Sequence, residues 1–203
     1  MTSKIILIIK IVCFQPETKY LYSMANFNTK ITKRVQKFIE TQKMFFVGTA
    51  PKNGRINLSP KGMDSFRILN ENKIAWLSVT GSGNETAAHL IDDNRITIMF
   101  CAFEGAPNIV RIYGTAREIR PNHEDWNGLI SQFTKLPGTR QIFEVSIESV
   151  QTSCGMSIPY YEYAGERNQL NDWAIDKGEA EIEQYWEDRN QTSIDGLPTN
   201  IMN

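Results

Sequence analysis

The stretch WLSVTGSGNETAAHL, residues 76–90, joins an apolar strand pattern to a helix pattern through a turn rich in glycine and hydroxyl side chains. Glycine lets a backbone approach a ligand closely, and the N–H groups at a helix start favour anions. Asn84 or Ser82 can also cap such a helix without any ligand. The turn TGSGNET, residues 80–86, therefore allows two interpretations, a capped connection or a cradle for a phosphate group.

The turn differs from the common nucleotide-binding loops. The P-loop pattern GxxxxGK[ST] has a lysine after its second glycine, and residues 80–86 contain no lysine. The GxGxxG fingerprint is not matched either. Any positive charge for a phosphate must therefore come from another part of the chain.

The segment NLSPKG, residues 57–62, offers such a charge. Ser59 and Lys61 are two residues apart on a predicted strand, so they point to the same side. A lysine at a strand end is often only a solvated charge. Next to a glycine-rich helix start, Lys61 would instead supply the positive charge that a phosphate requires.

Arg111 is a third candidate, within the alternating segment IVRIYGTA, residues 109–116. An arginine in this setting is either a cation on the polar face of the strand or a planar donor along a polar ring edge. Both interpretations stay open.

Composition limits the classes of function. The 203 residues are 41% hydrophobic and 22% charged, with a net charge of −1, so no overall basic field attracts nucleic acid or an anionic membrane. Cys13, Cys101 and Cys154 form no CxxC pair, which favours a reduced, cytoplasmic setting. Two histidines, His89 and His123, are too few for a multi-histidine metal site, so we expect no metal. A Ser-His-Asp site stays open, although no GxSxG elbow is present.

The N-terminal segment MTSKIILIIKIVCF is too short to span a bilayer and is interrupted by Lys10. No A-x-A-like cleavage site follows it, although an export or anchor signal remains the alternative. We interpret residues 1–23 as an N-terminal extension, disordered or not native. Residues 24–203 are then a single domain with a C-terminal helical tail.

Hydrophobic periodicity predicts about six strands with helices between them. A helix should begin at Asn28 or Thr29 and run to about Gln42, and the tail should be helical over about 166–190 with a break at Gly178. The expected strands are 44–51, 56–62, 73–80, 95–103, 109–119 and 140–153, and the other helices 84–94 and 123–133. This order predicts an α+β domain, mainly β, built as a six-stranded antiparallel split barrel with peripheral helices.

The order FVGTA, NGRINLSPKG, IAWLSVTGSGNETAAHL, ITIMFCAF and RIYGTA resembles the FMN-binding split-barrel proteins of the pyridoxamine 5'-phosphate oxidase-like superfamily. The tail segments SCGMSIPYYEYAGER and SIDGLP resemble those of a subgroup of this superfamily, the pyridoxamine 5'-phosphate oxidase family proteins. The resemblance covers about residues 26–198. It implies a homodimer with FMN at the interface.

The resemblance also implies roles for individual residues. In this family a basic residue on the second strand and the helix start after the third strand hold the FMN phosphate. The segment just before that helix lies along the isoalloxazine ring and the ribityl chain, and Arg111 would be a ring-edge or substrate-side contact. The implied contacts to the cofactor are Ser59, Lys61, Ser78, Val79, Thr80, Ser82, Asn84, Glu85, Thr86 and Arg111.

The chain departs from the authentic pyridoxamine phosphate oxidases. It lacks their C-terminal Arg-x-His substrate motif and their arginine-rich phosphate pair, so pyridoxamine phosphate is not the expected substrate. Glu85 beside a phosphate would repel it, so its side chain should point outward or only its backbone N–H should contribute. Tyr160, Tyr161 and Tyr163 line either a substrate pocket or a strand edge.

The resemblance implies an FMN-binding flavoprotein that acts as an oxidoreductase on a small-molecule substrate or electron donor. No catalytic residue is assigned. The alternative is a non-catalytic protein on the same scaffold that binds or senses flavin or haem, and a deazaflavin in place of FMN is a third hypothesis.

Overall fold

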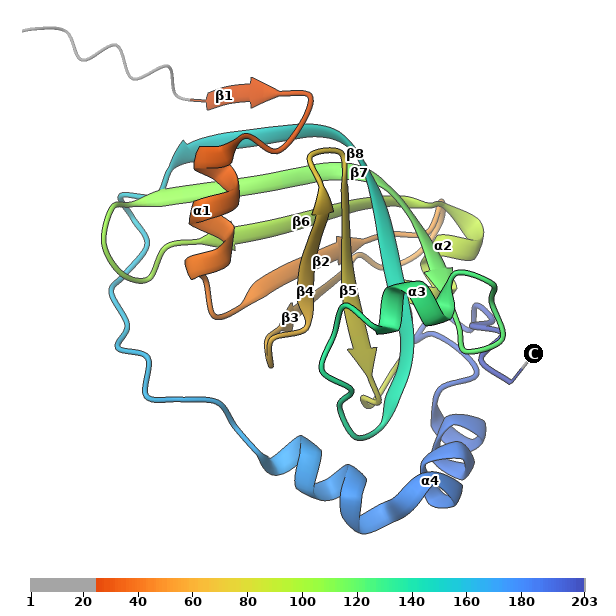
Figure 1. Ribbon diagram of the computed structural model, residues 1–203. Helices are drawn as coiled ribbons and strands as arrows, with labels where there is room; N and C mark the ends of the chain where they lie inside the picture. The colour runs from red at the N-terminus through yellow and green to blue at the C-terminus, as the bar shows by residue number, and fades with distance from the viewer. Residues whose placement is uncertain (1–24, 203) are drawn as a thin grey trace, which may run out of the picture.

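The computed structural model describes residues 25–202. The interpretation of residues 1–23 lies outside this range and stays a prediction. Across residues 25–202 the chain forms one curled antiparallel sheet with helices at its periphery (Figure 1). The split-barrel architecture predicted from the sequence is therefore confirmed, and the sheet is open between its two edge strands, β3 and β4.

The sheet has eight strands in the order β3-β2-β6-β7-β8-β5-β4, with β1 paired to β8. Every pairing is antiparallel, and β7 and β8 are long enough to be shared by both halves of the curled sheet. The strands are β1 (Ala25–Asn28), β2 (Phe45–Thr49), β3 (Asn57–Lys61), β4 (Phe66–Asn70), β5 (Lys73–Val79), β6 (Arg95–Cys101), β7 (Asn108–Ile119) and β8 (Thr139–Cys154).

The prediction of six strands was too low by the two short strands β1 and β4. β4 forms a hairpin with β5, in which Phe66 lies opposite Trp76. β1 pairs with the far end of β8, where Asn28 lies opposite Val150. The residues expected to begin the first helix therefore lie in or just after a strand, because their partner is more than 120 residues away in the chain.

The first helix, α1 (Lys33–Thr41), begins later than predicted, and its cap is Thr32, whose side chain accepts a hydrogen bond from Val35 N at 3.3 Å. Val35 and Ile39 bury its apolar face against the barrel core, which also contains the stacked rings of Trp76 and Phe143. A core continuous across the two halves of the sheet fixes the positions of the strand ends that form the site.

The remaining helices are α2 (Glu85–Asp92), α3 (Trp126–Ile130) and α4 (Gln169–Arg189). The predicted break at Gly178 is confirmed by its φ of 70° and ψ of 170° inside α4. An extended segment, residues 155–168, carries the chain from β8 to α4, which lies outside the curled sheet (Figure 1) and contacts it through a hydrogen bond from Trp186 Nε1 to Thr80 Oγ1. No helix within residues 25–202 is both long and apolar enough to cross a membrane.

Pro60 illustrates how one residue of the sequence positions the site. Proline cannot donate to a strand ladder, so the sequence predicts an edge or a bulge there. Pro60 lies opposite Phe46 on β3, which is indeed an edge strand. β3 therefore has only one neighbouring strand, β2. On its open side Lys61 borders a cavity.

Candidate anion and cofactor site

A pocket of about 700 Å³ lies where the turn 80–84 meets the start of α2. Its walls come from the β2–β3 connection, β3, β5, the first residues of β8 and the C-terminal end of the chain. We call this pocket the cradle. The sequence-predicted residues that line it are Ser59, Lys61, Ser78, Ser82, Asn84, Glu85 and Thr86.

The cradle forms because β5 is buried over most of its length and then ends abruptly. Residues 74–78 of β5 are buried between β4 and β8, and the strand stops at Val79. The following turn contains Gly81 and Gly83, both of which line the pocket, and leads to α2, which begins at Glu85. The backbone at this turn and the first N–H groups of α2 therefore border the same pocket.

Asn84 occupies the N-cap position of α2 but does not cap the helix with its side chain, contrary to one interpretation of the sequence. Its Oδ1 instead accepts from Gln141 Nε2 at 2.6 Å, and Asn84 and Gln141 are both buried. This contact gives the buried amide of Gln141, on β8, a hydrogen-bond partner. The helix start is thus left without a side-chain cap, as an anion site requires.

Lys61 lies at the end of β3 and is partly buried. Burial, and secondly the positive charge of Arg140, lower the pKa of Lys61 from 10.5 to about 8. The ammonium group is still mainly protonated at neutral pH. The positive charge of Arg140 thus disfavours the charged form of Lys61, and an anion between the two side chains would favour it.

Arg140, at the start of β8, is a cradle residue that sequence reasoning missed. It is 7% exposed, and its guanidinium donates to Asn190 Oδ1 at 2.7 Å and to Gly83 O at 3.2 Å. Its Nε is buried without a hydrogen-bond partner, and the Glu118 carboxylate acts on its charge although no carboxylate of residues 25–202 forms an ion pair with it within 4.0 Å. Burial lowers the pKa of Arg140 to about 10.

A signal for Arg140 was present in the sequence. The strand RQIFEV is otherwise dominated by residues typical of a buried strand, and charged residues are almost never fully buried unless they are paired or functional. A guanidinium that lines the cradle and forms no ion pair with a carboxylate of residues 25–202 within 4.0 Å fits an anionic group there. Phosphate is the anion whose geometry best matches an arginine beside a helix start.

Val79 and Thr80 lie beside the cradle rather than in it. Both line a smaller cavity of about 170 Å³ that also borders Lys61. The Thr80 hydroxyl donates to Gly138 O at 2.9 Å and accepts from Trp186 Nε1 at 2.7 Å. Thr80 is therefore already engaged in holding α4 to the barrel, and its hydroxyl has little left to offer a ligand.

Arg111 lies on β7, and the structure does not bring it to the cradle. Its guanidinium donates to Ser153 Oγ on β8 at 3.1 Å. Cys101, on the neighbouring β6, is close enough for the charge of Arg111 to act on its thiol. A contact between Arg111 and a cofactor within one chain is thus not seen, and a contact through a second copy stays a prediction.

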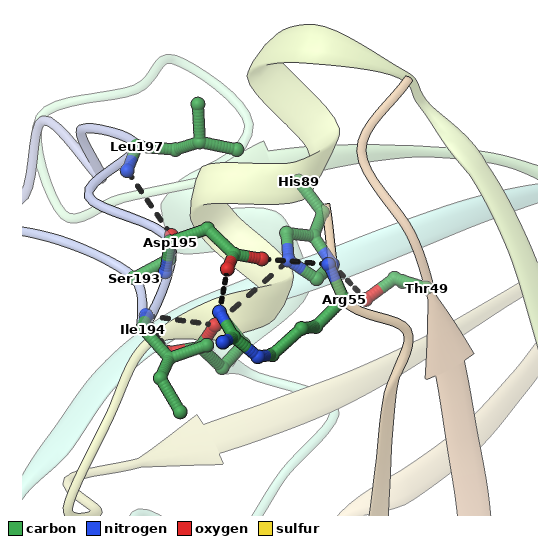
Figure 2. Close-up of polar contacts among 8 residues, drawn as sticks. Thr49, Arg55, His89, Ser193, Ile194, Asp195 and Leu197 are labelled. Carbon is green, nitrogen blue, oxygen red and sulfur yellow. Dashed lines mark hydrogen bonds and ion pairs between the residues drawn. The ribbon is translucent and has the colours of Figure 1, made fainter. Parts of the chain in front are cut away.

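The Glu85 side chain does not project freely into solvent, which was the first of the two alternatives expected from the sequence. Its carboxylate accepts hydrogen bonds from the backbone N–H of Ile194 at 3.0 and 3.2 Å (Figure 2). It also lies 3.8 Å from Nε2 of His89, which packs against Thr49 through a 3.0 Å contact between Nδ1 and Oγ1. The Glu85 carboxylate is therefore bonded to the C-terminal segment at the wall of the cradle.

A second, more apolar cavity of about 1170 Å³ adjoins the cradle at Lys61. Tyr161 and Tyr163 line it, as does Phe46 of β2, whereas Tyr160 is exposed outside it. The tyrosines belong to the extended segment 155–168, which forms no strand, so the strand-edge interpretation was wrong. Lys61 stands between a polar pocket and an aromatic one.

The family of the chain follows from comparison with known proteins. Residues 31–154, more than half of the chain, match the family model described as Pyridoxamine 5'-phosphate oxidase. The chain belongs to this family. A relative from Aspergillus flavus, named pyridoxamine 5'-phosphate oxidase family protein ustO, is 33% identical over 196 residues, which cover 86% of this chain and 78% of the relative.

Solved structures with a similar fold share less sequence identity with this chain. HupZ from Group A Streptococcus has a TM-score of 0.48 and 20% identity, and the match covers 59% of this chain and 91% of HupZ. HutZ, the heme storage protein from Vibrio cholerae, has a TM-score of 0.47 and 18% identity over 60% of this chain and 93% of HutZ.

Proposed function

We propose that the protein binds FMN, with the phosphate in the cradle, and acts as a flavin-dependent oxidoreductase on a small organic molecule. The observation that carries this proposal is the pair of Lys61 and Arg140. Both cations line one pocket and both have pKa values lowered mainly by burial; the charge of Glu118 acts on Arg140, but no carboxylate of residues 25–202 forms an ion pair with either cation within 4.0 Å. A buried pair of like charges is stable only when an anion compensates it.

Several residues of the cradle would each contact the phosphate through a different chemical group. Arg140 lines the cradle with its guanidinium side chain, and Lys61 lines it with its ammonium group. The uncapped start of α2 offers backbone N–H groups, and Ser82 and Thr86 offer hydroxyls from the same wall. Glu85 contributes only through its backbone, because its carboxylate is engaged with Ile194.

The strand and cavity beyond Lys61 suit the rest of such a cofactor. Ser78 and Val79, at the end of β5, border the path from the cradle to the aromatic cavity. Bound FMN would supply reversible hydride chemistry, and the chain would hold the phosphate, orient the ring and shape the access of the substrate. We further propose a cytoplasmic homodimer in which a second copy, through residues such as Arg111, covers the open face of the ring.

A titration of the full-length protein with FMN and with riboflavin, followed by flavin fluorescence, tests the proposal. Riboflavin lacks the phosphate, so a phosphate cradle predicts that FMN binds much more tightly. One charge-assisted contact contributes about 1.5–3 kcal/mol, which corresponds to roughly 10- to 150-fold in the dissociation constant. Equal affinity for the two flavins, or none for either, would refute the role of the cradle.

Catalysis and simple binding are separated by a second measurement. The FMN-loaded protein is mixed anaerobically with NADH or NADPH, and the flavin absorbance is followed. Bleaching within a catalytic timescale supports an oxidoreductase, whereas bound flavin that no donor reduces supports a carrier or sensor. Addition of haem to the FMN-free protein, read by its visible absorption, tests the haem-binding alternative directly.

A further inference from the structure

The C-terminal loop, residues 190–200, is a closed element held by its own hydrogen bonds. Ser193 N donates to Leu197 O at 2.8 Å, and Thr199 Oγ1 donates to Asn190 O at 2.6 Å, which joins the two ends of the loop. Asn190 and Thr199 are fully buried. The loop therefore meets the rest of the protein as a preformed unit.

Two carboxylate contacts tie this loop to the elements around the cradle (Figure 2). The Glu85 carboxylate, at the start of α2, accepts from Ile194 N. The Asp195 carboxylate accepts from the backbone N–H of Arg55 at 2.6 Å and forms an ion pair with its guanidinium. The Arg55 backbone N–H lowers the pKa of Asp195, so this contact is present throughout the neutral range.

Asn190 makes a third connection, directly to the cation of the cradle. Its Oδ1 accepts from Arg140 Nη1 at 2.7 Å, and its Nδ2 donates to Gly81 O at 3.1 Å. One amide of the loop thus fixes both the guanidinium and the glycine turn. A change in the position of the loop changes the orientation of Arg140.

The C-terminal end of the chain also forms a wall of the cradle. Arg189, Thr192, Ser193 and Ile194 all line the pocket. Arg189 immediately precedes the loop and is exposed, so the docked loop holds a further cation at the rim. Without the docked loop, the pocket loses this wall and is more open to water.

Glu85 connects loop docking to the charge of the cradle. With the loop docked, its carboxylate accepts the Ile194 N–H. With the loop released, an unpaired carboxylate would remain at the helix start, where it repels a phosphate. A phosphate in turn favours the state in which Glu85 is engaged. Binding of the anion therefore favours docking of the loop, and docking favours binding by the same free energy, because such coupling is reciprocal.

We propose that the C-terminal loop is a latch that completes the phosphate site, so that a phosphate monoester and the docked loop stabilise each other. The proposal rests on the proposed function and assigns positioning roles to Glu85, Asn190 and Asp195. It also assigns Arg189 as a rim contact to the anion. In this proposal the segment SIDGLP, residues 193–198 of the loop, helps to form the cofactor site.

The decisive variant is Ile194→Pro in the full-length chain, because it removes the N–H that Glu85 accepts. Ile194 is 71% exposed, so the change removes no core packing. Ile194→Ala keeps the N–H and is the matched control. Glu85→Gln, added to Ile194→Pro, removes the unpaired charge. Dissociation constants for FMN and riboflavin are measured for each protein.

The latch predicts that Ile194→Pro weakens FMN by roughly tenfold and leaves riboflavin within twofold, whereas Ile194→Ala, which keeps the N–H but trims one side chain of the pocket wall, weakens FMN far less than the proline variant. Adding Glu85→Gln should restore most of the FMN affinity. Three outcomes would overturn the latch: equal FMN affinity for the proline and alanine variants, equal weakening of both flavins, or no restoration by glutamine. Any of them leaves FMN binding itself intact.

Trypsin supplies a readout that does not depend on flavin. It cleaves after exposed arginines, and Arg189 is the residue at which the loop begins. The latch predicts that inorganic phosphate slows cleavage after Arg189 in the natural chain and that Ile194→Pro accelerates it. If the natural chain binds no FMN, the proposed function fails, and protection by phosphate alone then decides the latch. Cleavage that is insensitive to phosphate would contradict it.

Discussion

Replacing Lys61 by Met should strengthen the free protein and weaken its binding of FMN at the same time. Methionine keeps the length of the aliphatic stem and removes the charge. In the free protein that charge is unfavourable, because burial and Arg140 lower the pKa of Lys61 from 10.5 to about 8. In the complex the same charge contacts the phosphate. A residue with a merely structural role would not produce these opposite signs.

The magnitude of each effect follows from the environment of Lys61. A pKa lowered from 10.5 to about 8 corresponds to a destabilisation of the charged form on the order of 3 kcal/mol at most. For a domain of this size, each kcal/mol shifts the melting temperature by about 2–4 °C. We therefore expect the free variant to melt several degrees higher. Loss of one charge-assisted contact should weaken FMN roughly 10- to 150-fold.

The pH dependence has a definite sign. In the free protein Lys61 is charged below about pH 8, and its unfavourable burial is fully present there and is relieved as the pH rises from 8 toward 10.5. The stability difference between the variant and the natural chain should therefore shrink over that window. FMN affinity of the natural chain should fall as the pH rises through 8, while that of Lys61→Met changes little.

Thermal melts and FMN titrations at pH 7 and pH 9.5 measure both quantities. Lys177→Met, on the exposed face of α4 where Lys177 pairs with Glu181, is the matched control and should change neither. A Lys61→Met protein that melts lower than the natural chain, or that binds FMN equally well, would refute the reasoning about the charge of the cradle.

Three other substitutions test separate contacts. Arg140→Met should weaken FMN by at least roughly tenfold and riboflavin far less; equal losses would show that the guanidinium serves only the fold. Trp186→Phe removes the 2.7 Å hydrogen bond to Thr80 and should cost about 0.5–1.5 kcal/mol in a denaturant melt; an unchanged midpoint would mean that α4 is held by other contacts. Asn84→Ala leaves the buried amide of Gln141 without its partner and should cost about 1–3 kcal/mol in the same assay; a smaller loss would show that water replaces the amide.

The parts of the site that the sequence predicted depend on local chemistry. The turn 80–86, the strand pairing through Lys61 and the edge position of Pro60 follow from glycine, proline and the alternation of side chains over a few residues. These signals act within one element and its neighbour. The predicted gathering of Lys61 and the start of α2 in one pocket needed the additional resemblance to a family with known order of strands.

The parts that the sequence did not predict depend on contacts between distant residues. Arg140 lies 57 positions after the Gly83 carbonyl that it contacts, and Ile194 lies 109 positions after Glu85. The pairing of β1 with the end of β8 is similarly distant, and it displaced the predicted helix start. Periodicity carries no information on such pairs, because it describes the face of an element and not its partner.

The most direct test of the central claim is a thermal melt of the full-length protein with and without FMN, together with its visible spectrum. A ligand at 100 times its dissociation constant stabilises the native state by about 2.7 kcal/mol, which corresponds to a rise of roughly 5–11 °C for a domain of this size. We predict this rise with FMN, a much smaller one with riboflavin at the same concentration, and a shifted flavin absorption band. A melting temperature that FMN leaves unchanged, with no change in the flavin spectrum, would contradict the assignment of the cradle as a flavin phosphate site.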